Sequence, residues 1–284
     1  MRVIITGAAG LVGAALTEHC RARGDEVLAF DREGLDITDE RAVREAFKSL
    51  RPDAAVNCAA WTDVDGCELD PQRAFLVNSQ GVESLATASR LAGASFVTVS
   101  TDYVFDGRRE GHFYTQRDDP HPLSAYGAAK LEGERRAQAA SARTSVVRTG
   151  WVFGRGGRNF LATVVERARR GETLRAITDS YGTPTYAPDL AARLRGLAEL
   201  DLPGVYHVVN AGGGASYEGF AREAAAAAGL PDAQIEAVQT DSLQRPAPRP
   251  RNSRLRCLIS EAIGLPPLRD WRAALAEFAS ADRP

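Results

Sequence analysis

The chain has 284 residues, of which 44% are apolar and 25% charged, and its formal net charge is -2. This length allows a large buried core, and the near-neutral charge gives no reason to expect a nucleic-acid or membrane-surface partner. No apolar run approaches about eighteen residues, and the N-terminus lacks the regions of a signal peptide, so we expect a cytoplasmic protein without a transmembrane helix.

The first half of the chain alternates short apolar runs with longer helical patterns. Strands are predicted at residues 2–6, 26–31, 53–60, 95–101 and 144–149, and helices at 11–23, 40–50 and 71–92. Ser124 is a candidate N-cap for a further helix that carries Tyr126 and Lys130. Strands that alternate with helices in this way predict a doubly wound, Rossmann-like α/β fold with helices on both faces of a parallel sheet.

The second half is less regular. Helices are predicted at residues 159–170, 189–200, 217–229 and 270–278, strands at 172–177 and 204–210, and a proline-rich loop at 246–253. We therefore divide the chain into residues 1–156 and 157–284. The second part is expected to form a smaller α/β cap over the carboxyl edge of the sheet, with segments near 189–210 returning to the main sheet.

Three glycines, Gly7, Gly10 and Gly13, follow the first strand and open the first helix. Such glycines allow a tight turn and let the backbone approach a pyrophosphate at the helix N-terminus. A simple packing turn is the alternative. Asp31 ends the second strand, where a carboxylate would meet the adenosine ribose, whereas Arg32 could pair with the extra phosphate of NADP, so the residues leave the choice of cofactor open.

Tyr126 and Lys130 are four residues apart, on one face of the predicted helix. Only two of the 35 basic residues are lysines, so the retention of one here suggests chemistry that a guanidinium cannot replace. A nearby ammonium favours phenolate and would bring the pKa of the tyrosine toward working pH. Coincidence is the alternative. Thr101 and Asp102 end the fourth predicted strand, where the hydroxyl could bind a substrate oxygen or simply cap a turn.

Arginines and cysteines supply weaker signals. The loop R-P-R-N-S-R from Arg249 to Arg254 could contact a diphosphate, or it could be a solvated basic loop. The four cysteines, Cys20, Cys58, Cys67 and Cys257, form no C-x-x-C pair and have no metal-ligand spacing. We expect reduced thiols, with Cys58 in the core, and no metal site.

Several longer strings resemble one family closely. They are A-A-W-T-D-V-D from Ala59, V-S-T-D-Y-V-F-D-G from Val99, Y-G-A-A-K-L-E-G-E from Tyr126, R-T-G-W-V-F-G from Arg148, G-T-P-T from Gly182 and R-P-R-N-S-R-L from Arg249. Together with the glycine turn, they resemble the extended short-chain dehydrogenase/reductase superfamily and, within it, the dTDP-4-dehydrorhamnose reductase family. The resemblance runs from the first strand almost to the C-terminus.

The resemblance implies reduction of a nucleotide-linked 4-keto-6-deoxy sugar by NADPH, with NADH as an alternative donor. Tyr126 would protonate the C4 oxygen, Lys130 would hold the nicotinamide ribose and lower the pKa of Tyr126, Thr101 would position the carbonyl and Asp102 would order the site. Substrate contacts would come from Thr62, Asp65, Thr101, Tyr103, Trp151 and Arg249. The cofactor would be lined by Gly7, Gly10, Leu11, Val12, Gly13, Asp31, Arg32, Asp36, Ile37, Asn57, Ala59, Ala60, Tyr126 and Lys130.

Related 4,6-dehydratases carry Thr-Asp-Glu, whereas Tyr103 follows Asp102 here, which favours simple reduction over dehydration. Ala15 and Pro188 stand where some members place acidic metal ligands, so a monomer or weak homodimer without metal is expected. Ser180 replaces a glutamine common before G-x-P-T. Two other functions stay open: reduction of another nucleotide-linked 4-keto-deoxyhexose, and a non-catalytic NADP-binding role like that of the methionine adenosyltransferase regulatory subunit.

Overall fold

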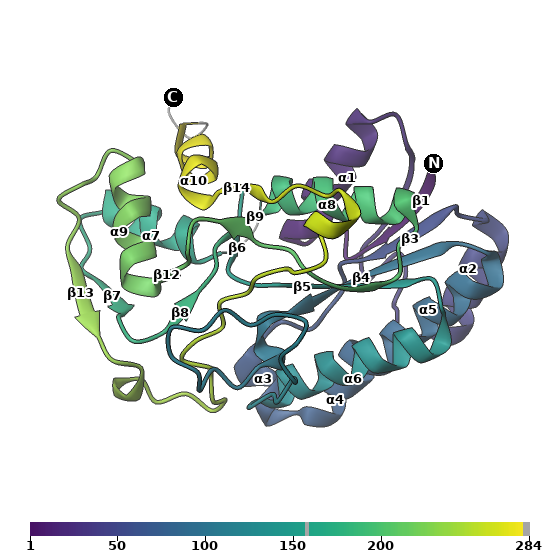
Figure 1. Cartoon of the computed structure of the whole chain (residues 1–284), viewed down its shortest axis with the longest axis horizontal. Coiled ribbons are helices and arrows are strands. Elements are labelled where there is room, and N and C mark those ends of the chain that lie inside the picture. Colours follow the sequence, from purple (N-terminus) through teal and green to yellow (C-terminus); the bar gives the residue numbers. More distant parts are fainter. Residues whose placement is uncertain (157–158, 281–284) are drawn as a thin grey trace.

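The computed structural model describes residues 1–156 and 159–280, so the predicted division between residues 156 and 157 falls at the edge of a segment outside the described residues. A six-stranded parallel sheet forms the centre of the molecule (Figure 1). Its strands are β1 (Arg2–Thr6), β2 (Glu26–Phe30), β3 (Ala54–Asn57), β4 (Ser95–Thr101), β5 (Thr144–Thr149) and β10 (Gly204–His207). They lie side by side in the order β10-β5-β4-β3-β1-β2.

Helices cover both faces of the sheet, which confirms the predicted doubly wound fold (Figure 1). The helices around the sheet are α1 (Leu11–Ala22), α2 (Glu40–Leu50), α3 (Val64–Leu69), α4 (Pro71–Phe75), α5 (Gly81–Ala92), α6 (Ala125–Ala140) and α8 (Ala187–Leu200). Helices α1 and α8 pack on one face, and α2, α5 and α6 on the other. Successive side chains of a strand point to opposite faces, and β1 accordingly gives Val3 and Ile5 to one core and Ile4 to the other.

The predicted helix at 71–92 is interrupted by one wider turn. A π-helical segment, Leu76–Gln80, separates α4 from α5. Such segments are rare and often occur at functional sites. The short helix α3 was not predicted, and neither were the 3₁₀ turns Asp102–Val104, Thr240–Ser242 and Glu261–Ile263.

The remaining elements form a smaller layer with its own core. They are β6 (Val152–Phe153), α7 (Phe160–Arg169), β7 (Leu174–Ile177), β8 (Tyr181–Gly182), β9 (Thr185–Tyr186), β11 (Asn210–Ala211), β12 (Ala215–Ser216), α9 (Tyr217–Ala227), β13 (Ile235–Val238), β14 (Leu268–Asp270) and α10 (Trp271–Ser280). Phe153, Phe220 and Trp271 lie at the centre of this core and are almost fully buried. The strands pair two by two, as β6 with β9, β7 with β13, β8 with β12 and β11 with β14.

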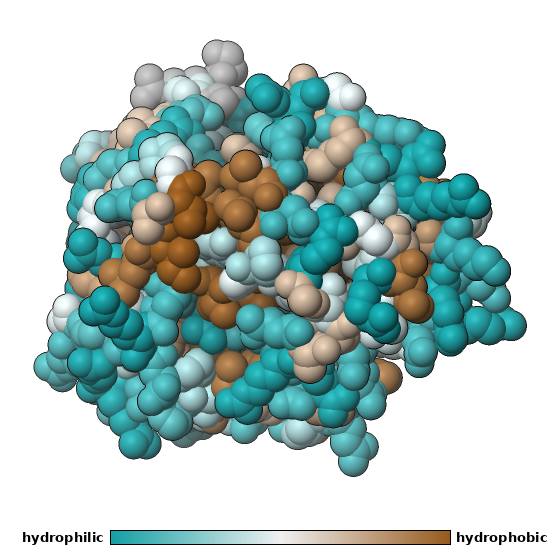
Figure 2. All heavy atoms as spheres, turned by 45° about the vertical axis from the view of Figure 1, so that its right-hand side comes forward, coloured by the Kyte–Doolittle hydropathy of each residue, from teal (hydrophilic) through white to brown (hydrophobic). Residues whose placement is uncertain are grey.

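One face of the molecule is drawn with its side chains in Figure 2. On the face drawn in Figure 2, hydrophilic side chains cover most of the area, and apolar ones gather in one region. No helix within residues 1–156 and 159–280 is both long enough and apolar enough to cross a bilayer.

Helix α6 is fixed to the sheet by a buried ion pair. Glu134 accepts hydrogen bonds from Arg148 of β5 at 2.7 and 3.0 Å, and from the Ser100 hydroxyl of β4. Both charged side chains are less than 8% exposed. Removing one partner of such a pair leaves an uncompensated buried charge.

We therefore expect Glu134→Gln to lower the free energy of unfolding by about 3–5 kcal/mol, because Arg148 loses its buried counter-charge. Glu132→Gln on the same helix is the matched control, since its partly exposed pair with Arg136 should contribute less than about 1 kcal/mol. Urea unfolding of both variants measures the two changes in unfolding free energy. Equal decreases would contradict the role of the buried Glu134–Arg148 pair in stabilising the fold.

Candidate active site

Two glycines of the turn, Gly7 and Gly13, stand where a side chain has no room. Gly7 has a φ of 69°, and a Cβ built there would lie 2.5 Å from the Ala59 nitrogen. A Cβ at Gly13 would lie 2.1 Å from the Gly7 carbonyl oxygen. Gly10 is the N-cap of α1 and has no side chain to cap it, so the helix N-terminus stays open to an anionic group.

A cavity of about 260 Å³ opens beside this turn. Eight of the residues predicted to line the cofactor lie in its wall: Gly7, Gly10, Asp31, Arg32, Asp36, Ile37, Ala59 and Ala60. The wall also contains five residues that were not predicted to bind the cofactor: Leu35, Cys58, Trp61, Arg73 and Val77. Cys58 was expected in the core; it follows the end of β3, is partly buried, packs against the core below α1 and α8, and also lines this cavity.

Six predicted cofactor residues lie outside this wall, of which Tyr126 and Lys130 belong to α6 and are described below. Leu11, Val12 and Gly13 belong to the first turn of α1. Asn57 is buried at the end of β3, where its Oδ1 accepts from the Thr6 hydroxyl at 2.7 Å and from the Ala59 N–H at 3.0 Å. Its Nδ2 donates to Thr98 at 3.1 Å. Asn57 therefore holds the loop that lines the cavity.

Three charged residues, Asp31, Arg32 and Asp36, line the part of the cavity that follows β2. Asp31 accepts a hydrogen bond from the Gly34 N–H at 2.9 Å, which fixes the turn after β2. Arg32 lies 3.5 Å from Asp36, and both side chains are exposed. The position of Asp31 at the end of β2 agrees with the predicted place of a ribose-binding carboxylate.

Helix α6 brings Tyr126 and Lys130 to the carboxyl end of β4. Ser124 caps the helix, as predicted, by accepting from the Gly127 N–H. Tyr126 and Lys130 are both buried, and the Lys130 ammonium donates to the Val99 carbonyl at 2.7 Å. Burial lowers the pKa of Lys130 to about 8, and the charge of Glu134 opposes this shift.

We expected Lys130 to lower the pKa of Tyr126, but the Tyr126 pKa is raised and Lys130 is not among the groups that shift it. Burial raises the pKa of Tyr126 above its usual range, a hydrogen bond with Thr101 opposes the rise, and the charge of Asp102 adds to it. The ammonium is directed at the Val99 carbonyl. In this structure desolvation therefore decides the pKa, and it keeps the phenol protonated.

Thr101 and Asp102 lie next to this tyrosine. The Thr101 hydroxyl donates to Asp102 Oδ1 at 3.1 Å and accepts from the Tyr103 N–H at 3.1 Å. Asp102 is 3% exposed, and burial raises its pKa to about 6. A Cβ at Gly150 would lie 2.5 Å from the Asp102 carboxyl carbon, so glycine is needed there to admit the carboxylate.

The predicted substrate residues come from both halves of the chain. Trp151 stacks on Tyr217 with ring centroids 3.8 Å apart, and its ring occupies the space that a Cβ at Gly182 would fill. Arg249 forms two hydrogen bonds with Asp65 of α3, at 2.7 and 2.9 Å. Thr62 is exposed on the loop before α3.

A narrow cavity of about 10 Å³ lies among these groups. Tyr103, Trp151 and Arg249 line it, together with residues that had no assigned role, among them Tyr217, Arg245 and Ser253. Ser253 could have been noticed, since it belongs to the R-P-R-N-S-R-L string, whereas no sequence signal marks Tyr217. Tyr103 also packs edge-on against Tyr126 at 6.1 Å, so this cavity adjoins the buried phenol.

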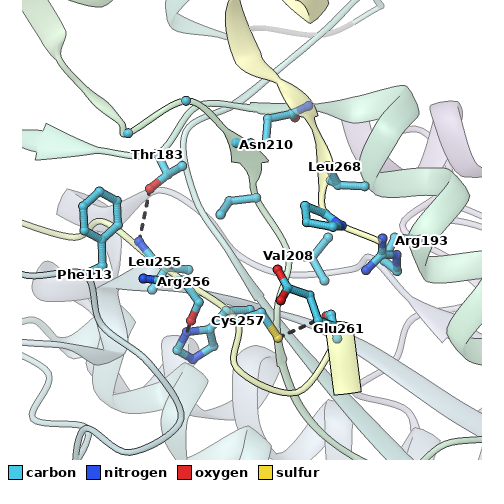
Figure 3. A pocket seen from close by; sticks show the side chains of 17 residues that line it. Phe113, Thr183, Arg193, Val208, Asn210, Leu255, Arg256, Cys257, Glu261 and Leu268 are labelled. Atoms are coloured by element: carbon cyan, nitrogen blue, oxygen red, sulfur yellow. Dashed lines mark hydrogen bonds between the residues drawn. The ribbon is translucent and has the colours of Figure 1, made fainter. Parts of the chain in front are cut away.

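A larger cavity, of about 300 Å³, lies beside the sheet edge formed by β10 (Figure 3). Phe113 and Thr183 stand on one side of it, and Arg193 and Leu268 on the other. None of the described residues in its wall is a predicted site residue. Within residues 1–156 and 159–280, no group of three or more His, Cys, Asp or Glu side chains could hold a metal ion.

Asp102→Asn tests the electrostatics of the buried carboxyl. Its folded pKa of about 6 is above the ordinary 3.8, so the folded protein binds more protons than the unfolded chain between these values, and stability falls as the pH rises through them. Relative to Asp102→Asn, the wild type should lose about 2–3 kcal/mol of unfolding free energy between pH 4 and pH 7. Urea unfolding at both pH values measures this change, and a difference between the proteins that does not vary with pH would contradict it.

Comparison with known proteins places this site in a family. The family model described as RmlD substrate binding domain matches residues 1–283. A dTDP-4-dehydrorhamnose reductase of Streptomyces griseus is 41% identical over 97% of this chain and 92% of its own length, and one of Mycolicibacterium smegmatis is 38% identical over 99% and 85%. The crystal structure of dTDP-4-dehydrorhamnose reductase from Bacillus anthracis in complex with NADP superposes with a TM-score of 0.95, at 33% identity over 99% of both chains.

These matches confirm the resemblance inferred from the motifs. They extend over the glycine turn, β4 with Thr101, α6 with Tyr126 and Lys130, and the late arginine loop, since each covers nearly the whole chain. The chain belongs to the RmlD substrate binding domain family, within the extended short-chain dehydrogenases/reductases.

Proposed function

We propose that this protein reduces dTDP-4-dehydro-6-deoxy-L-mannose (dTDP-4-dehydrorhamnose) to dTDP-L-rhamnose with NADPH. The observation that carries the proposal is the buried Tyr126 near Thr101, in a cluster against which Trp61 of the glycine-turn cavity packs. Open α/β sheets bind their ligands at this edge. The reaction adds hydride to C4 and a proton to the C4 oxygen, so it needs an acid at that oxygen.

The residues present fit a nicotinamide dinucleotide. Gly7 and Gly13 have no space for a Cβ, and the N-terminus of α1 has no side-chain cap, as a closely approaching pyrophosphate requires. Asp31 would meet the adenosine ribose and Lys130 the nicotinamide ribose. When bound, the cofactor supplies the hydride. NADPH is the proposed donor, with NADH as an alternative, because Arg32 lies beside Asp31.

Tyr126 is suited to donate the proton. Reduction consumes a proton at the substrate oxygen, so the tyrosine must start as a phenol. Burial and the charge of Asp102 both hold it in that form. Thr101 would hold the carbonyl oxygen in reach. Asp102 would order the Thr101 hydroxyl, to which it is hydrogen-bonded. No glutamate follows Asp102, so the second carboxylate that dehydration requires is missing from the Thr-Asp-Tyr string.

The nucleotide sugar would lie between the two parts of the chain. Arg249 is the candidate for the diphosphate, because its guanidinium lines the narrow cavity and a phosphate would take the place that the Asp65 carboxylate now holds on it. Trp151 and Tyr103 would contact the sugar or base, with Thr62 and Asp65 at the rim. In this assignment residues 1–156 bind the dinucleotide, and residues 157–284 mainly bind the substrate. A cytoplasmic monomer or weak homodimer is part of the same proposal.

The test is NADPH oxidation by the purified protein with dTDP-4-dehydrorhamnose, with NADH run in parallel. We expect oxidation and formation of dTDP-L-rhamnose, and Tyr126→Phe should reduce turnover by about 10²–10⁴-fold. The affinity for NADPH should stay within about twofold in this variant, because the change removes one hydroxyl and keeps the ring.

Two outcomes would argue against the proposal. A protein that binds NADPH but oxidises it with no nucleotide-linked 4-keto sugar would indicate a non-catalytic subunit, and oxidation only with a different keto sugar would correct the substrate. Near-normal turnover by Tyr126→Phe would remove the tyrosine from its role as acid.

A further inference from the structure

Arg73 lines the cofactor cavity, although no motif marks it. It lies in the first turn of α4, two residues after Pro71. Its guanidinium carbon lies 4.3 Å from the centre of the Trp61 ring, and both side chains belong to the wall that also contains Gly7, Gly10 and Asp31. Guanidinium groups stack on aromatic rings while their N–H groups stay free for other acceptors.

Trp61 is a fixed platform for this arginine. Asn78, which is buried in the π-helical segment, accepts from the Trp61 N–H at 2.9 Å and donates to the Trp61 carbonyl at 2.9 Å. The ring itself rests over Gly66, where a Cβ would lie 2.9 Å from it. The π-helical segment after α4 therefore places Asn78 where it holds the Trp61 backbone, and the Trp61 ring in turn supports Arg73.

Arg73 is the one basic residue in the wall of the cofactor cavity that forms no ion pair within residues 1–156 and 159–280. Four charged residues line the cavity, Asp31, Asp36, Arg32 and Arg73. Arg32 is paired with Asp36 at 3.5 Å, whereas none of the ion pairs found among residues 1–156 and 159–280 includes Arg73. Without Arg73 the wall would carry a net negative charge, which opposes the entry of a ligand that is itself a polyanion.

We propose that Arg73 binds a phosphate group of the nicotinamide dinucleotide. The inference rests on the cofactor use proposed above and adds a residue that determines cofactor affinity. Two phosphates have the required chemistry: the pyrophosphate, which NADH and NADPH share, and the 2′-phosphate, which only NADPH carries. In either case a planar, stacked guanidinium presents paired N–H donors to phosphate oxygens.

The experiment measures dissociation constants of the full-length protein for NADPH and NADH, from the change in cofactor fluorescence. Arg73→Gln should weaken NADPH binding by about 10–100-fold, the range expected for a lost hydrogen bond to a charged group. Arg73→Lys keeps the charge but lacks the planar guanidinium, so it should weaken NADPH binding less than Arg73→Gln does. Arg21→Gln is the matched control, because Arg21 is also exposed and lies in the last turn of α1, at the opposite end from the glycine turn.

The two cofactors identify the phosphate. If Arg73→Gln weakens the binding of NADH and NADPH equally, Arg73 binds the pyrophosphate. If it weakens the binding of NADPH alone, Arg73 binds the 2′-phosphate. Affinities in Arg73→Gln that match those of Arg21→Gln for both cofactors would overturn the inference. A wild-type protein that binds neither dinucleotide would refute the proposed function itself, which separates the two failures.

Discussion

The packing of helix α6 against strands β4 and β5 is the constraint on which the site depends. Tyr126, Lys130 and Glu134 follow one another at four-residue intervals and are all buried. Glu134 pairs with Arg148, and Lys130 donates to the Val99 carbonyl, so the helix is attached to both strands by charged groups. Since the two strands end at the same edge of the sheet, this attachment sets where the phenol lies relative to Thr101 and the glycine turn.

Burial controls the chemistry of this site more than ion pairing does. It raises the pKa values of Tyr126 and Asp102 and lowers that of Lys130, so each group is moved toward its neutral form. A neutral phenol is the form that a reductase needs before the proton is transferred. The buried Asp102 carboxyl destabilises the fold when ionised, a cost that proteins accept at functional sites. Arg73, stacked on Trp61, and Arg249, paired with Asp65, place guanidinium groups in the walls of the two cavities.

The sequence predicted the parts that depend on local patterns. The prediction covers seven strands, namely β1 to β5, β7 and β10. These strands, the glycine turn, the Ser124 cap and the Tyr126–Lys130 face follow from apolar periodicity, glycine spacing and helix geometry. The partner of Lys130 was missed, because a backbone carbonyl leaves no sequence signal. Trp61 and Arg73 were missed as cavity residues because their stacking depends on the path of the chain through α3, which was not predicted. The pairs β7–β13 and β8–β12 join short segments that are distant in sequence, and such pairing is not encoded by either segment alone.

The central claim is that Tyr126, fixed by α6, donates a proton while hydride passes from the bound nicotinamide to C4 of the sugar. The most direct test incubates the protein with dTDP-4-dehydrorhamnose and NADPH that carries deuterium at both C4 positions of the dihydronicotinamide, followed by NMR of the sugar product. The account predicts dTDP-L-rhamnose with deuterium at C4, and loss of this product in Tyr126→Phe. Product without deuterium at C4, or undiminished labelling in the tyrosine variant, would contradict it.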